Sequence, residues 1–176
     1  MTNECFLLLL LAGSLLTGCA NPPHPSEFDA GLENQSGLSF APDGATAYWA
    51  AWDGKWGSSA AGKRTIFYSV RSGPGWSRPE PVPFGGDASN DDPFVSPDGR
   101  WLYFVSARPD RDIWRYRLDG SKRIERLAVN SGAEEYSPIV VASGALYFAS
   151  SRPGGAGQGD IYRAEPDGEA FSDPVT

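Results

Sequence analysis

The sequence predicts an all-β fold, and three observations lead to this prediction. A long phrase recurs along the chain, because residues 96–114 read SPDGRWLYFVSARPDRDIW and residues 142–162 read ASGALYFASSRPGGAGQGDIY. A weaker copy begins at Ser39 and resumes at Thr65. The 176 residues include 21 Gly and 15 Pro, and no helical pattern competes with the strand pattern after the N-terminal segment. A repeat of this length indicates one supersecondary unit stacked several times.

Each copy of the repeat predicts four short antiparallel strands. In the middle copy, Pro97-Asp98-Gly99 is a turn signal, since Pro fixes φ, Asp caps its own backbone and Gly accepts a positive φ. Four strands in about 45 residues are typical of one β-propeller blade. The strands of this copy are expected at 93–96, 101–105, 112–117 and 127–129. The blades are expected at about 32–82, 83–130 and 131–176.

The phrase resembles the TolB-type, WD-repeat-like β-propeller repeat of bacterial envelope proteins. That pattern joins an S-P-D-G turn, an L-Y-F-x-S strand, an R-P-G-G loop and a D-I-Y strand, and it is matched from Pro93 to Trp114 and from Pro138 to Tyr162. The third copy lacks the Pro-Asp of its turn, and the first copy lacks the Arg-Pro. The resemblance covers about residues 38–176 and implies a propeller. It leaves function open, because such repeats occur in transport accessory proteins, peptidoglycan-associated proteins and peptidase propellers.

The N-terminus predicts a secreted lipoprotein. Residues 5–16 form an apolar run that suits a signal peptide over 1–18. Leu16-Thr17-Gly18-Cys19 resembles a bacterial lipobox, which implies lipidation of Cys19 and a Pro-rich tether over 19–31. The resemblance implies the periplasmic face of a bacterial envelope, and Ala20 favours the outer membrane of a Gram-negative host. An ordinary secretory signal is the alternative, since the first four residues carry no Lys or Arg.

Composition argues against several classes of function. The net charge of −7 argues against a nucleic-acid partner. The single histidine, His24, lies in the tether, so the blades cannot assemble a Ser-His-Asp triad or a His-ligated metal. Acidic residues at Asp87, Asp91-Asp92 and Glu134-Glu135 are interpreted as solvated turn caps and not as a calcium site or a glycosidase pair. We therefore expect no catalytic residues, no metal and no cofactor.

Two arginines hold the same place in successive copies. Arg108 and Arg152 both follow the second expected strand of their blade. One interpretation is structural, with each guanidinium bonding carbonyls of a neighbouring strand or pairing with an aspartate such as Asp112 or Asp160. The other is functional, with the arginines binding a carboxylate or a peptidoglycan fragment.

Aromatic residues divide into expected core and expected surface. Tyr103-Phe104 and Tyr147-Phe148 recur in register and are expected in the core between blades. Trp52 and Trp56 flank a Gly-rich insertion in the first copy. If they are exposed, they mark a contact surface for a protein or glycan partner.

The leading functional hypothesis is a non-enzymatic, lipid-anchored envelope protein that presents its propeller to a protein or cell-wall partner. The alternatives are a propeller belonging to a larger peptidase- or lyase-associated enzyme, and a module that binds a glycan or peptide. Three blades do not close a ring, because propellers typically have four to eight. The sequence therefore predicts further C-terminal blades outside this chain, a homodimer that closes the ring, or a stable half-propeller.

Overall fold

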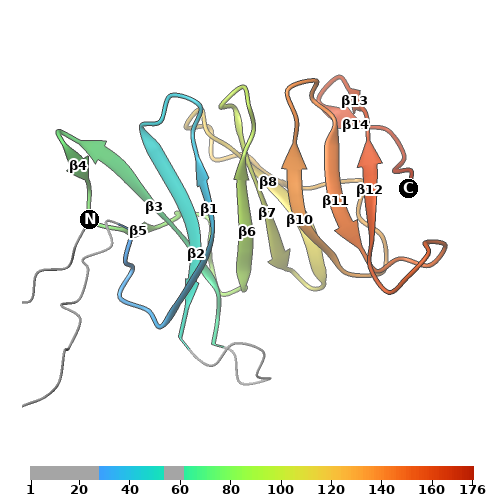
Figure 1. Cartoon of the computed structure of the whole chain (residues 1–176), viewed down its shortest axis with the longest axis horizontal. Coiled ribbons are helices and arrows are strands. Elements are labelled where there is room, and N and C mark those ends of the chain that lie inside the picture. The colour runs from blue at the N-terminus through green and yellow to red at the C-terminus, as the bar shows by residue number, and fades with distance from the viewer. Residues whose placement is uncertain (1–27, 54–61) are drawn as a thin grey trace, which may run out of the picture.

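The computed structural model describes residues 28–53 and 62–176, and these form an all-β fold of three successive antiparallel blades (Figure 1). The predicted propeller class is confirmed. The predicted signal peptide, Cys19, most of the tether and Trp56 lie outside the described residues.

Each blade runs in chain order from its innermost to its outermost strand. Blade 1 contains β1 (Asn34–Phe40), β2 (Thr46–Trp52), β3 (Thr65–Ser72), β4 (Gly75–Trp76) and β5 (Glu80–Pro81). Blade 2 contains β6 (Asn90–Val95), β7 (Trp101–Ala107), β8 (Arg111–Arg117) and β9 (Ile124–Arg126). Blade 3 contains β10 (Glu135–Val140), β11 (Leu146–Ser150), β12 (Asp160–Ala164), β13 (Pro166–Asp167) and β14 (Ala170–Phe171). Val175 pairs with Arg163 where β5 pairs with β3 in blade 1.

The outermost strand of blade 2 lies three residues earlier than the sequence predicted. Ile124–Arg126 pairs with β8, whereas Leu127 and Val129 are buried in the core cluster shared with blade 3. The side-chain amide of Asn130 donates to the carbonyls of Ile113 and Leu127, at 2.8 and 2.9 Å. This side chain fixes 127–129 as a turn and not as a strand.

The turn after each innermost strand depends on a glycine. Gly44, Gly99 and Gly144 have φ values of 65°, 70° and 89°. Each donates its N–H to the carbonyl three residues earlier, at 2.8 Å. Blade 3 forms this turn with Ala-Ser in place of Pro-Asp, so the residue that the conformation requires is the glycine.

The core consists of two aromatic clusters between successive blades. Ile66, Val82 and Phe104 are buried between blades 1 and 2. Tyr103 and Ile113 are buried against blade 3, whose buried contributors to this cluster are Val140, Leu146, Phe148, Tyr162 and Ala164. The expected core positions therefore lie between blades, except Tyr147, which is only half-buried.

Candidate interaction sites

A bulge recurs at the same place in all three innermost strands. The pairing register shifts between Ser36 and Ser39 in β1, and equivalent shifts occur in β6 and β10. At each shift one residue has a positive φ, namely Gly37 (66°), Asp92 (49°) and Ser137 (51°). The bulges were not predicted from the sequence. Its available signal was a short polar residue before Pro93 and Pro138, since Asp tolerates the left-handed region better than most residues.

The bulges connect neighbouring blades. The amide of Ser137 in β10 donates to Asp92 Oδ2 of β6 at 3.0 Å. The amide of Val95 in β6 donates to Ser39 Oγ of β1, also at 3.0 Å. The innermost strands belong to separate sheets, so these side-chain bonds bridge them where no β-ladder does. They also fix the Asp92 carboxylate beside the bulges.

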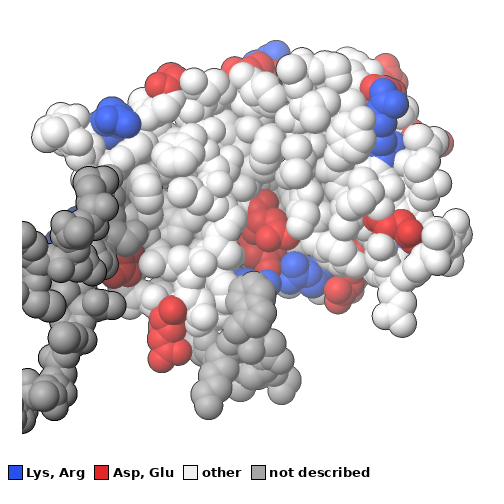
Figure 2. All heavy atoms as spheres, in the orientation of Figure 1, with Lys and Arg blue, Asp and Glu red and all other residues white. Residues whose placement is uncertain are grey.

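A shallow groove of about 250 Å³ crosses the three bulges. Residues 37–39, 92–94 and 137–139 line it. Leu38 and Ile139 are 50% and 47% exposed there, which is unusual for large apolar side chains in strands. The face in front of these strands is mostly uncharged, with acidic atoms near its centre (Figure 2). This surface, which we call the inner groove, combines apolar side chains with the carboxylate of Asp92.

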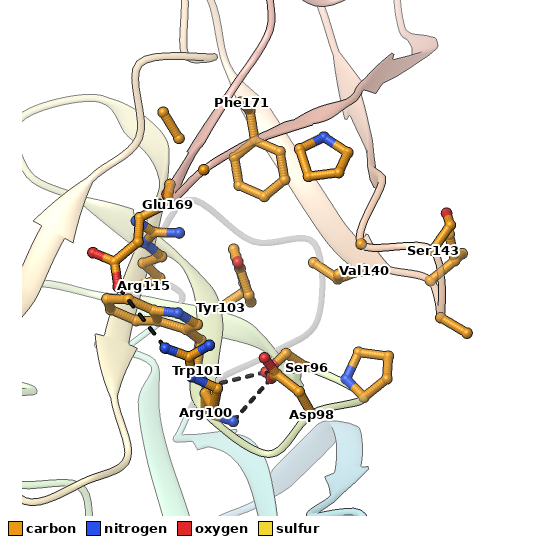
Figure 3. Close-up of a pocket in the computed structure, with 17 residues that line it drawn as sticks. Ser96, Asp98, Arg100, Trp101, Tyr103, Arg115, Val140, Ser143, Glu169 and Phe171 are labelled. Atoms are coloured by element: carbon orange, nitrogen blue, oxygen red, sulfur yellow. Dashed lines mark hydrogen bonds and ion pairs between the residues drawn. The ribbon is translucent and has the colours of Figure 1, made fainter.

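A second cavity of about 250 Å³ lies between blades 2 and 3 (Figure 3). We call it the blade 2–3 pocket. Three turns form its walls, at 96–101, 140–144 and 166–171. Tyr103 and Trp101 lie on one side of the opening, and Phe171 lies on the other. The pocket therefore brings aromatic side chains and polar turn residues together.

Arg115 is the buried charge of this pocket. Only 5% of it is exposed, and its Nε donates to Glu125 Oε1 at 2.5 Å. Its Nη2 donates to the Glu169 carbonyl at 2.6 Å, and its guanidinium lies 4.0 Å from the Trp101 ring. Burial raises the pKa of Tyr103, although Arg115 opposes the shift, so Tyr103 is a neutral phenol at neutral pH.

Two carboxylates at the rim of the pocket stay ionised. Hydrogen bonds from Arg123 and then Arg117 lower the pKa of Glu169. Burial works against ionisation of Asp98, but hydrogen bonds from Ser96 Oγ (2.5 Å) and the Arg100 amide (3.0 Å) lower its pKa. The rim thus presents paired charges around a neutral phenol.

Arg108 and Arg152 both bind the segment that enters their own blade. Arg108 Nη2 donates to the carbonyls of Phe84 and Gly85, at 2.7 and 2.6 Å. Arg152 Nη2 donates to the Val129 carbonyl at 2.7 Å and to Glu135 Oε1 at 3.1 Å. These contacts match the carbonyl-bonding interpretation.

The aspartates proposed as their partners bind elsewhere. Asp112 accepts two bonds from Arg126, at 2.6 and 2.8 Å. Asp160 accepts from the amide of Gly157 at 3.2 Å. Of the two structural alternatives, pairing of Arg108 or Arg152 with Asp112 or Asp160 is therefore wrong. Asp112, the second residue of β8, reaches the outer strand, and Asp160, the first residue of β12, reaches the adjacent loop. In the turn of 97–99, Asp98 caps the Arg100 amide as described above.

Trp52 does not offer an exposed contact surface. It is 1% exposed, and the Arg64 guanidinium lies 4.9 Å from its ring centroid. The exposure on which a contact surface at Trp52 depended is therefore absent, because Trp52 ends a strand that packs against blade 2. Trp56 lies outside the described residues.

Two acidic residues interpreted as solvated are in fact buried. Asp91 is 3% exposed and pairs with Arg64 and Arg111. Glu135 is fully buried and accepts a bond from Ser150 Oγ at 2.9 Å. The sequence could not show this, because the arginines that pair with these two residues lie 17 to 27 positions away in the chain. Among residues 28–53 and 62–176, no group of three or more His, Cys, Asp or Glu is arranged to hold a metal.

No family model matches the chain. Among curated proteins, an uncharacterised protein of Agrobacterium fabrum, Atu1656, is 40% identical over 84 residues, which are 46% of this chain and 28% of that protein. The chain therefore spans less than a third of this relative. Within the described part of the chain, no helix is long and apolar enough to span a membrane.

Two solved structures share the fold. A TolB structure from Agrobacterium tumefaciens matches with a TM-score of 0.58 and 22% identity, over 79% of this chain and 48% of that one. A puromycin-hydrolysing peptidase of Mycobacterium tuberculosis matches with a TM-score of 0.59 and 16% identity, over 81% of this chain and 22% of that one. Both likenesses show the propeller fold.

Proposed function

We propose that this chain is a non-enzymatic envelope protein whose propeller binds a protein or cell-wall partner through the inner groove. The observation that carries the proposal is the repeated bulge, which exposes Leu38 and Ile139 and holds the Asp92 carboxylate between them. Apolar side chains next to one fixed carboxylate suit an extended peptide that carries a basic residue.

Lipid anchoring and the envelope location are part of this proposal. They are supported by the lipobox around Cys19 and by the fold shared with TolB. Labelling cells with a fatty-acid analogue should mark the wild-type chain, and Cys19→Ala should abolish the label. Fractionation should place the wild-type chain in the membranes, and an unlabelled wild-type chain in the soluble fraction would reject the anchor.

Binding through the inner groove is tested by photo-crosslinking in intact cells. A photoreactive residue in place of Leu38 or of Ile139 should give the same discrete adduct. The control is Val70, which is 40% exposed at the end of β3 and outside the groove. Adducts from Val70 that match those from Leu38 in identity and yield would reject the inner groove as the binding surface.

A glycan-binding function is the second candidate, and the blade 2–3 pocket favours it. Trp101, Tyr103 and Phe171 line it beside polar turn residues, and Phe171 is the partly exposed ring of the three. Soluble peptidoglycan fragments should then raise the melting temperature in a saturable way. Phe171→Leu should remove most of that increase, whereas the matched Phe40→Leu change, outside the pocket, should keep it.

A third candidate is a propeller that belongs to a larger enzyme. The match to 22% of a peptidase chain favours it, because the rest of that protein lies outside the matched region. The intact mass of the native protein from cell envelopes tests this alternative. A polypeptide much heavier than this chain, with hydrolase activity that co-purifies, would favour it over a binding scaffold.

A further inference from the structure

Four arginines lie around one tryptophan, Trp101, beside the blade 2–3 pocket. The guanidiniums of Arg115, Arg117 and Arg123 lie over its ring, 4.0, 4.6 and 5.4 Å from the ring centroid. The fourth, Arg100, directly precedes Trp101 in the chain and lines the pocket. Stacking on an aromatic face holds a guanidinium in a fixed position. These four residues, which we call the arginine cluster, therefore present positive charge in fixed positions beside the pocket.

The carboxylate of Glu169 lies in the arginine cluster. Glu169 stands between β13 and β14 of blade 3, and Figure 3 shows it next to Arg100 at the edge of the pocket. Arg117 Nη1 donates to Glu169 Oε1 at 3.0 Å, and Arg123 Nη1 donates to Glu169 Oε2 at 2.8 Å. Arg100 Nη2 lies 4.0 Å from Oε1. Each carboxylate oxygen thus binds its own guanidinium, which is how arginines recognise a carboxylate.

The packing of one blade on the next does not require these arginines. Trp101 and Arg117 form the first pair between the second and third strands of blade 2. The equivalent pair in blade 1 is Thr46 and Val70. Blades 1 and 2 therefore pack without an aromatic ring and a guanidinium at these positions, so the cluster is a feature of the blade 2–3 interface and not of the repeat.

The Glu169 side chain can turn away without moving the backbone around it. Half of this side chain, 51%, is exposed. Arg115 Nη2 donates to the Glu169 carbonyl at 2.6 Å, and the Ser172 amide donates to the Glu165 carbonyl at 2.8 Å. Both bonds end on backbone atoms, so neither depends on the Glu169 carboxylate. An incoming anion therefore needs to displace one side chain only.

The arginine cluster keeps its shape when the Glu169 side chain leaves. Arg117 also pairs with Asp119 at 3.0 Å, and Arg123 also pairs with Glu125 at 2.8 Å. Among residues 28–53 and 62–176, the ion pairs left to the cluster are those with the carboxylates of Asp119 and Glu125. Four guanidiniums then share two carboxylates, so the vacated position attracts an anion.

Two cavities meet at Glu169. The blade 2–3 pocket lies on one side, and a cavity of about 270 Å³ that Arg123 lines lies on the other. Glu169 and Phe171 line both cavities. Phe171 is the partly exposed ring of the pocket, and it stands two residues after Glu169 on the same hairpin. A ligand with a ring against Phe171 and a carboxylate in place of Glu169 therefore fits this arrangement.

We propose that the arginine cluster binds the carboxylate of an acidic sugar, and that the Glu169 side chain occupies this site until such a ligand displaces it. Because one carboxylate replaces another, no guanidinium loses its counter-charge during the exchange. The inference names the ligand class of the blade 2–3 pocket, so it rests on the glycan-binding candidate and is independent of the inner groove.

Isothermal titration calorimetry of the full chain in detergent tests the proposal with two sugars. N-acetylmuramic acid carries a carboxylate, and N-acetylglucosamine is the same sugar without it. Wild type should bind N-acetylmuramic acid at least about tenfold more tightly. Glu169→Ala should tighten this binding by about another tenfold, because it removes the competing carboxylate. The matched control is Asp167→Ala, which removes the same charge from the same hairpin outside both cavities and should change neither affinity.

A second pair of variants tests the arginines. Arg123→Gln, added to Glu169→Ala, should cancel the gain in affinity for N-acetylmuramic acid. Arg163→Gln in the same background should keep it, because Arg163 is equally exposed (48%) and pairs with Glu165 outside the cluster. Thermal melts of each variant verify that the blades stay folded.

Three outcomes would overturn the proposal. Equal affinity for the two sugars would reject the carboxylate site and leave the glycan-binding candidate standing. Equal gains from Glu169→Ala and Asp167→Ala would show a general effect of charge and not displacement of Glu169. Binding of neither sugar, in wild type or in Glu169→Ala, would reject both the site and the glycan-binding candidate.

Discussion

Blades 2 and 3 carry the same repeat, yet their matching residues occupy different environments. Ile113 is fully buried and Ile161 is 63% exposed, although both lie on the third strand of their blade and face the same way. Among residues 28–53 and 62–176, blade 2 has a neighbouring blade on each side, whereas blade 3 packs against one. The comparison shows that each repeat encodes a blade with an apolar surface on both faces. Whether a side chain on such a face is buried depends on whether another blade packs against it.

The two blades also differ in how they satisfy a buried polar position. In blade 3, Glu135 accepts bonds from Ser131, Ser150 and Arg152. In blade 2 the equivalent residue is Asn90, whose Nδ2 donates to the Gly85 and Ala88 carbonyls at 2.9 Å. Blade 3 thus relies on a buried ion pair where blade 2 relies on neutral hydrogen bonds.

Truncating the two isoleucines gives the largest expected difference. Ile113→Ala should lower the free energy of unfolding by about 4 kcal/mol, because it opens a cavity in the cluster between blades. Ile161→Ala should change the stability of the monomer by about 0.5 kcal/mol or less. Urea unfolding at low protein concentration measures both. Comparable losses would show that the face of blade 3 is already covered.

The propeller class could be predicted from the sequence because the signals of its strands and turns are local. A glycine with a positive φ sets the turn after each innermost strand. Gly44, Gly99 and Gly144 could be recognised in the sequence as turn residues. Alternating aromatic and β-branched residues marked the second and third strands. The last strand of blade 2 was predicted at 127–129 because Leu127 and Val129 are apolar. These residues are apolar because they are buried against blade 3, and the strand itself is β9 at Ile124–Arg126.

The candidate sites were less predictable because they depend on contacts between distant residues. The burial of Asp91 requires Arg64, which precedes β3, and Arg111 of β8, and the burial of Trp52 requires the packing of blade 1 on blade 2. The bulges at Asp92 and Ser137 had a local signal in the prolines that follow. That signal is ambiguous, because the residue before a proline usually has an extended, negative-φ conformation.

Arg152 in blade 3 and Arg108 in blade 2 hold equivalent places, so truncating each one compares a buried ion pair with neutral hydrogen bonds. Arg152→Ala should cost about 3 kcal/mol, since it leaves Glu135 buried without its cation. Arg108→Ala should cost about 1–2 kcal/mol, because it removes bonds to two carbonyls and a contact with the Trp114 ring, and it leaves no buried charge unpaired. Guanidinium chloride unfolding at neutral pH measures both losses and shows whether Arg152→Ala costs more than Arg108→Ala. Adding Glu135→Gln to Arg152→Ala should recover part of the loss, and no recovery would argue against the buried charge as its cause.

The turns after the innermost strands give the smallest effect, and it depends on pH. Asp98 in blade 2 has a lowered pKa, whereas Ser143 at the same place in blade 3 does not titrate. A carboxyl whose pKa is lower in the folded state stabilises the protein above its ordinary value of 3.8, and this contribution disappears as the pH falls through the folded-state pKa. Asp98→Asn keeps an oxygen acceptor for the Arg100 amide and removes only the charge.

Wild type should therefore be more stable than Asp98→Asn at pH 7, and the difference should shrink toward zero as the pH falls below about 3.8. Ser143→Ala serves as the control, because its effect contains no titration and should stay constant over the same range. Urea midpoints measured from pH 7 to pH 2.5 give both curves. A constant difference between wild type and Asp98→Asn would mean that the carboxylate contributes through its shape and hydrogen bonds, as Ser143 does in blade 3, and not through its charge.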